Sequence, residues 1–136
     1  MTGLIGIPNK KNPYFSNVAG AAAFSVGEEA TDVITVRVTL KTPQLGAVAG
    51  KAGVFFFLSD DASGNSVVGT AADGGVASGT NGFLMSLVTG KAGFAVTEDD
   101  GTVDIAVTHS GGAKTCYLCV VLPTGGVAVS GAVTFA

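Results

Sequence analysis

Two cysteines separated by two residues, Cys116 and Cys119, are the first candidates for chemistry in this chain. A Cys-x-x-Cys pair at a turn or a helix start can form a redox pair or supply half of a zinc site. Here the pair lies in run 115–122, which alternates like a strand, so the Cα atoms should be about 10 Å apart with side chains on opposite faces. A disulfide needs Cα atoms within about 6.8 Å. We therefore expect two buried free thiols.

His109 is the only histidine, and it is followed by Ser110 and two glycines. Serine, histidine and aspartate can assemble into a catalytic triad from distant positions in a chain. However, the sequence contains no Gly-x-Ser-x-Gly nucleophile elbow. A single histidine at the end of a strand is more typical of a solvated loop. The sequence therefore predicts that the protein is not an enzyme.

Two acidic turns raise the question of calcium, which takes six to eight oxygen ligands. One turn is the stretch 60–65, and the other is 98–100 together with Asp104. Neither follows the helix-flanked calcium loop, and Asp-Gly turns also arise for purely conformational reasons. The stretch 73–75, Asp-Gly-Gly, lacks the Lys-Ser/Thr of a phosphate-binding loop. We predict no metal and no cofactor, and calcium at the acidic turns stays an open alternative.

The composition bounds the partners of the chain. Charged residues make up 12% of the 136 residues, about half of the usual share, which suggests that part of the surface meets another protein. The formal net charge is −3 and the seven basic residues are scattered, whereas phosphate backbones need a basic stripe. No apolar run approaches the roughly 20 residues that span a bilayer. We expect neither nucleic acid nor a membrane as a partner.

The elements that would position these residues are short β-strands. The clearest is run 32–40, where four aliphatic residues on one face alternate with three polar residues on the other. A short strand is also expected near 67–69, within the loop-like stretch 59–80. The further predicted strands are 22–26, 54–59, 82–89, 91–97, 102–108, 115–122 and 127–135.

A tight turn, 98–101, separates the predicted strands 91–97 and 102–108. Aspartate and glycine supply the turn conformations that a hairpin needs. We therefore predict that these two strands pair with each other. The residues expected to face inward are Ala92, Phe94 and Val96 on the first strand and Val103, Ile105 and Val107 on the second.

The strand with three consecutive phenylalanines is apolar on both faces. Val54, Phe56 and Leu58 lie on one side, and Phe55 and Phe57 lie on the other. A strand of this kind needs cover on both faces, so we expect the strand as a whole to belong to the core. Phe55 and Phe57 are also our candidates for contact with a partner.

This series of short strands and the absence of helical periodicity predict an all-β domain at 21–136. We expect an immunoglobulin-like antiparallel β-sandwich, with a small β-barrel as the alternative. Residues 1–20 contain two strand-breaking prolines and are predicted to form an extended N-terminal arm. It either folds over its own domain or packs on a neighbouring subunit, and we expect the second. Its candidate interface residues are Leu4, Ile5, Ile7, Tyr14 and Phe15.

The passage from Asp104 to Cys119 resembles the E-to-F strands of immunoglobulin-like sandwiches, because Tyr117 stands two residues before a cysteine. The usual earlier cysteine partner is missing, and the chain has no tryptophan. The resemblance therefore implies a sandwich without the inter-sheet disulfide. An ordinary half-buried strand tyrosine is the alternative interpretation.

Residues 32–136 also resemble small structural proteins encoded among the head genes of tailed bacteriophages. The segments that carry this resemblance are 32–36 (Asp-Val-Ile-Thr-Val), 57–61 (Phe-Leu-Ser-Asp-Asp) with Gly64, 117–118 (Tyr-Leu), 121–125 (Val-Leu-Pro-x-Gly) and 129–136 (Val-Ser-Gly-Ala-Val-Thr-Phe-Ala). The chain is similar to a capsid decoration, or cement, protein with an immunoglobulin-like sandwich. The resemblance includes no active-site signature.

The resemblance implies a virion structural protein that is made in the host cytoplasm and binds the outer surface of the phage head. Its partner would be the major capsid protein, whose neighbouring subunits it clamps against internal pressure, and a second partner would be further copies of itself on the lattice. One alternative is an adhesive domain of a tail or fibre. Another is a carbohydrate-binding module or a small hydrolase, which the absence of tryptophan disfavours.

Overall fold

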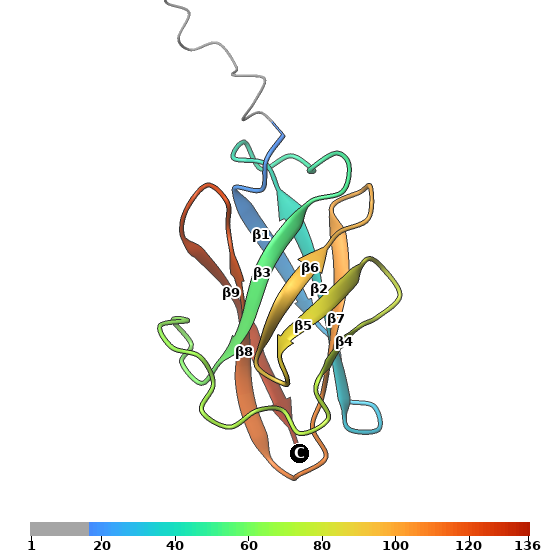
Figure 1. Ribbon diagram of the computed structural model, residues 1–136, viewed down its shortest axis with the longest axis vertical. Helices are drawn as coiled ribbons and strands as arrows, with labels where there is room; N and C mark the ends of the chain where they lie inside the picture. The colour runs from blue at the N-terminus through green and yellow to red at the C-terminus, as the bar shows by residue number, and fades with distance from the viewer. Residues whose placement is uncertain (1–16) are drawn as a thin grey trace, which may run out of the picture.

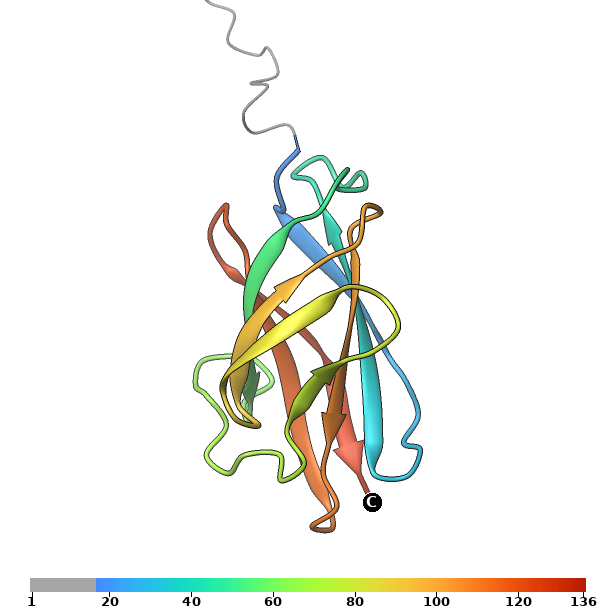
Figure 2. The same ribbon diagram turned by 45° about the vertical axis from the view of Figure 1, so that its right-hand side comes forward.

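The computed structural model describes residues 17–136, which form two antiparallel sheets packed face to face and contain no helix (Figures 1 and 2). The predicted all-β sandwich is confirmed. The barrel alternative is wrong, because no strand pairing joins the edges of the two sheets within these residues. The strands are β1 (Ala21–Val26), β2 (Val33–Lys41), β3 (Gly53–Ser59), β4 (Val76–Ser78), β5 (Phe83–Val88), β6 (Ala92–Val96), β7 (Thr102–Thr108), β8 (Lys114–Val121) and β9 (Val127–Phe135).

The strand order is β1-β2-β7-β4 in the four-stranded sheet and β5-β6-β3-β8-β9 in the five-stranded sheet. In immunoglobulin terms, β1, β2 and β7 occupy the positions of A, B and E, and β3, β8 and β9 those of C, F and G. The predicted E-to-F passage is therefore the step from β7 to β8. Strands β4, β5 and β6 fill the D, C″ and C′ positions, but the chain visits them in the reverse order.

In strand β2, the alternation of aliphatic and polar residues corresponds to the two faces of the strand. Its aliphatic residues are buried between the sheets and its polar residues face outward, as the sequence predicted. β7 contributes the same kind of inward face. These two strands pair with each other and form the central part of one wall of the core. The buried residues are Ile34, Val36, Val38 and Leu40 on β2 and Val103, Ile105 and Val107 on β7.

The predicted hairpin between β6 and β7 is wrong. β6 pairs with β3 and β5, whereas β7 pairs with β2 and β4, so the turn 98–101 carries the chain from one sheet to the other. The inward residues of β6 are Gly93 and Ala95, not Ala92, Phe94 and Val96. Only glycine fits at residue 93, because a Cβ there would lie 2.8 Å from the ring of Phe56, which fills the core at this point. The larger side chain of Phe94 lies on the outer face and packs on Phe55.

The loop after β3 also differs from the sequence-based expectation. No strand forms at 67–69; instead Val68 is buried and donates one backbone hydrogen bond to the carbonyl of Leu58. The short strand β4 was not predicted, because three residues are too few to show an alternating pattern. Its pairing with β7 places it at the edge of the four-stranded sheet.

Residues 17–20, which the sequence assigned to the arm, pack on the sandwich. The Asn17 amide donates to and accepts from the backbone of Ala49, at 2.6 and 2.8 Å. Ala19 is buried, and the Gly20 N–H donates to the Lys41 carbonyl. The five candidate interface residues of the arm, Leu4, Ile5, Ile7, Tyr14 and Phe15, lie outside the described residues.

Candidate interaction surface

The two outer faces of the sandwich differ in chemistry. The four-stranded sheet presents Thr35 and Thr39 together with an ion pair between Arg37 and Asp104. The outward positions of the five-stranded sheet carry no charged side chain at all. Polar side chains belong to a solvated face, whereas a contiguous apolar patch of this kind is typical of an interaction surface.

One line of outward residues crosses all five strands, and we call it the apolar row. The strand register places its members directly opposite one another from the β5 edge to the β9 edge. Cross-strand neighbours of this kind have Cβ atoms roughly 5 Å apart, so their side chains form one continuous surface. The members, in order, are Met85, Phe94, Phe55, Val121 and Val127.

Phe55 and Phe57, our predicted interface residues on β3, both point to this outer face. Phe55 is 54% exposed and packs edge-to-face on Phe94 with ring centroids 5.0 Å apart. Phe57 is half-buried. The expectation that β3 is covered on both faces is therefore wrong, because no further layer lies over Phe55 within residues 17–136. Val54, Phe56 and Leu58 form the buried side, as predicted.

The contribution of β5 to this surface was not predicted from the sequence. Phe83, Met85, Leu87 and Val88 are each more than half exposed. β5 is also the edge of its sheet, with a bulge between Ser86 and Val88. The signal in the sequence was a run of six residues without a charge, in which apolar side chains occur on both faces of the strand.

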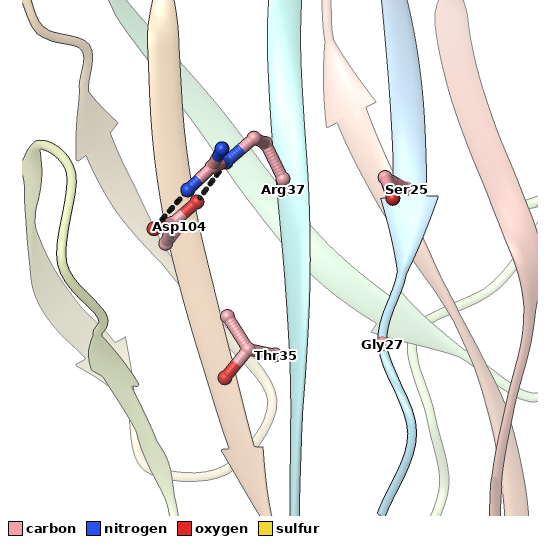
Figure 3. A pocket seen from close by; sticks show the side chains of 5 residues that line it. All are labelled: Ser25, Gly27, Thr35, Arg37 and Asp104. Atoms are coloured by element: carbon pink, nitrogen blue, oxygen red, sulfur yellow. Dashed lines mark hydrogen bonds and ion pairs between the residues drawn. The ribbon is translucent and has the colours of Figure 1, made fainter.

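Opposite this surface, Arg37 and Asp104 form a two-pronged ion pair on the four-stranded sheet. The Nε and Nη2 atoms of Arg37 donate to the Asp104 carboxylate at 2.8 and 3.1 Å, and the Asn81 N–H donates to it at 3.1 Å. The hydrogen bonds from Arg37 hold the pKa of Asp104 below its usual range. Figure 3 shows this pair lining an open pocket with Thr35 and Ser25. Because the guanidinium is already neutralised, the pocket offers little net charge to an anion.

The structure brings Asp73, His109 and Ser110 together, but not as a catalytic triad. His109 is buried rather than solvated, which corrects the sequence-based expectation; its Nδ1 accepts from the Asp73 N–H at 3.3 Å. The N–H and hydroxyl of Ser110 donate to Asp73 Oδ1, at 2.8 and 3.4 Å. The backbone hydrogen bond from Ser110 is the largest cause that lowers the pKa of Asp73, and the hydroxyl hydrogen bond lowers it further. The serine thus donates to the carboxylate and not to the imidazole. These hydrogen bonds connect the loop that contains Asp73 to the loop after β7.

Cys116 and Cys119 lie on opposite faces of β8, as predicted, and both are free and buried. Cys116 belongs to the core between the sheets. Cys119 points outward but is covered by the loop after β3, where a Cβ at Gly64 would lie 3.1 Å from its sulfur. Desolvation raises the pKa of both thiols, that of Cys119 to about 11. Neither thiol is a good nucleophile or metal ligand in this state.

The acidic turns use their carboxylates locally. Asp60 accepts from the Gly69 N–H, and Asp61 accepts from the Ser63 N–H, each at 2.9 Å. Asp100 accepts from Thr102 through both the hydroxyl and the N–H, which lowers the pKa of the carboxyl. Within residues 17–136, no three histidine, cysteine or acidic side chains converge as a metal site would require.

The fold and surface together define an immunoglobulin-like β-sandwich with one polar outer face and one uncharged, apolar outer face. No protein-family model and no curated protein sequence matches the chain. In the described part of the chain, no helix has the length and apolar character to cross a membrane.

Proposed function

We propose that this protein is a capsid decoration protein, which binds the outer surface of a tailed-phage head through the outer face of its five-stranded sheet. The observation that carries the docking part of this proposal is the apolar row, which joins five strands without a charge. The polar four-stranded sheet would then face solvent. The head-surface location rests on the resemblance of residues 32–136 to decoration proteins.

The size of the surface fits a docking site. Five strands about 4.8 Å apart make the row about 19 Å wide, and flanking residues such as Phe83 and Phe57 lie roughly 7 Å to either side along the strands. The resulting area of a few hundred Å² is in the range of functional patches on single domains. The aromatic residues at its centre, the exposed Phe55 and the half-buried Phe94, are the residue type that anchors protein interfaces.

In this proposal the partner is the major capsid protein. Such a contact stabilises a shell when one decoration protein touches two neighbouring subunits, because subunits held together resist pressure from inside. A rigid sandwich suits that role, since its two sheets enclose one continuous buried core. Further copies of the protein on the lattice are the second partner.

The direct test is co-sedimentation of the purified protein with expanded, empty capsids of the phage that encodes it. Phe55→Ser should weaken binding about tenfold or more, because Phe55 is the central member of the row. The matched control is Val67→Ser, which alters a residue of similar exposure in the loop after β3. Both variants should melt close to the unchanged protein.

Two results would count against this proposal. If the unchanged protein does not bind capsids but labels tails or fibres by immunogold microscopy, the adhesive-domain alternative replaces it. If capsids bind Phe55→Ser as tightly as the unchanged protein, the contact lies elsewhere on the molecule.

A further inference from the structure

We propose that two copies of this protein associate through the free edge of β5, which pairs antiparallel with β5 of the second copy about a two-fold axis. The pairing would join two five-stranded sheets into one sheet across both molecules. It uses the edge of the sheet and not the outer face that carries the apolar row. The dimer therefore goes beyond the proposed docking function and does not depend on it.

β5 is paired on one side only. It pairs with β6 and ends its sheet (Figure 1), so its other side presents backbone N–H and C=O groups that no strand of the sheet satisfies. Within the described residues, no turn or loop backbone hydrogen bond reaches residues 83–87. A bulge can turn an edge away from partners, but the bulge here follows Ser86, and residues 83–86 keep a regular register with β6. A further strand can therefore add to this edge.

The side chains of β5 distinguish it from the other three sheet edges of the described chain. β4 has only three residues, β1 exposes no large apolar residue and β9 exposes one, Val127. β1 and β9 also contact each other across the sandwich. Charged side chains commonly protect an edge strand from pairing, and β5 has none. Its exposed apolar residues are Phe83, Met85, Leu87 and Val88.

A second copy of the same chain suits this edge because two-fold pairing places the strand against itself. Any charged residue on the strand would then lie close to its own copy, and like charges opposite each other destabilise a strand pair. An uncharged strand such as β5 avoids that cost. The lack of charge thus favours self-pairing and not only pairing with a foreign strand.

The two ends of β5 differ in charge, which favours the antiparallel direction. The start of the strand lies beside Glu98, whose carboxylate accepts from the Gly82 N–H at 2.9 Å. The strand ends in a turn closed by the hydrogen bond from the Lys91 N–H to the Val88 carbonyl. Antiparallel pairing brings the start of one β5 to the end of the other. It therefore places Glu98 of each copy on the same side of the contact as Lys91 of the other copy.

The size of the contact predicts a weak dimer. Four half-exposed apolar side chains offer on the order of 100 Å² each, so two copies would bury roughly 800 Å², which is less than stable complexes bury. We expect a dissociation constant above about 10 µM. Copies held side by side on a surface reach higher effective concentrations, at which such a contact forms. Because Met85 is the row member on β5, the apolar rows of the two copies would then adjoin.

Sedimentation velocity of the full-length protein at about 5–500 µM measures this association. The unchanged protein should shift from monomer toward dimer over this range. Ser86 is exposed and does not belong to the apolar row. Ser86→Lys and Ser86→Asp should each weaken self-association at least tenfold, because each variant brings like charges together at the two-fold axis. An equimolar mixture of the two variants should form dimers again, because the charges are then opposite.

Two controls make the result specific to the edge. Val67→Lys adds the same charge in the loop after β3 and should dimerise like the unchanged protein. Phe55→Ser should also dimerise normally, because β3 lies two strands away from this edge. Loss of the dimer in Phe55→Ser but not in the Ser86 variants would overturn the proposal, because the outer faces would then be the contact.

Two further results would also overturn it: an unchanged protein that stays monomeric at every concentration, and a mixture of the two Ser86 variants that stays monomeric. No capsid is present in the experiment. Failure of the dimer therefore leaves the proposed docking function standing, and failure of capsid binding leaves the dimer standing.

Discussion

The carboxylate of Asp104 is buried and accepts three hydrogen bonds, two of them from Arg37. Its pKa is lower in the folded protein than in the unfolded chain, where it is about 3.9. A lowered folded pKa stabilises the fold at pH values above the unfolded pKa, and this contribution disappears as pH falls through the folded pKa. Asp104→Asn should therefore be less stable than the unchanged protein at pH 7, and the difference should shrink toward pH 2.

Urea unfolding at a series of pH values measures this effect. Asp99→Asn is the control, because Asp99 is exposed and its ion pair with Lys51 is 3.5 Å long, and exposed pairs contribute little. If the loss of stability in Asp104→Asn is the same at pH 2 and pH 7, it does not come from the ionised carboxylate of Asp104.

The two cysteines should be unreactive while the protein is folded. Burial raises the pKa of both thiols, to about 11 for Cys119, so the thiolate of Cys119 is on the order of 0.1% of the population at pH 8. A disulfide reagent such as dithiobis-nitrobenzoate should therefore label neither thiol rapidly in buffer and both in denaturant. Rapid labelling of one thiol in buffer would show that the loop over Cys119 opens readily.

At the scale of elements, alternate residues of β3 face the core and the proposed docking surface. We therefore expect the first set to contribute to stability and the second set to contribute to binding. Phe56 is 1% exposed and Phe55 is 54% exposed, although they are adjacent. Phe56→Ala should lower the free energy of unfolding by about 3–5 kcal/mol, whereas Phe55→Ala should lower it by less than about 1 kcal/mol. Chemical denaturation of the two variants measures both values. Similar losses for the two would mean that Phe55 is also part of a core.

The elements also show what the sequence could and could not predict. β2 was predictable because its two faces differ in polarity at every step. The pairing of β6 was not predictable. The acidic turn after it has residues typical of a hairpin turn, but the same residues also suit a turn that carries the chain into the other sheet. Among the row residues only Phe55 was singled out as an interface residue. The others become neighbours only through cross-strand register, which no local pattern encodes.

At the scale of the whole molecule, the described chain begins at one end of the sandwich and reaches its last residue near the other end (Figures 1 and 2). The backbone N–H of Ala136 donates to Glu29 in the β1–β2 loop, which holds that last residue in place. The start of β1, the β8–β9 turn and the acidic turn between β6 and β7 share the opposite end. The proposed docking surface is on one face of the sandwich, because all members of the apolar row belong to the five-stranded sheet.

The pairing of distant strands also sets a time scale for synthesis in the cell. β3 pairs with β8, so this central pairing cannot be completed until about 70 further residues have followed the start of β3. At about 5–20 residues per second, a ribosome needs several seconds for that stretch. During this interval the three phenylalanines of β3 and the uncharged β5 have no finished sheet to join. We therefore expect the nascent chain to bind chaperones that recognise exposed apolar strands.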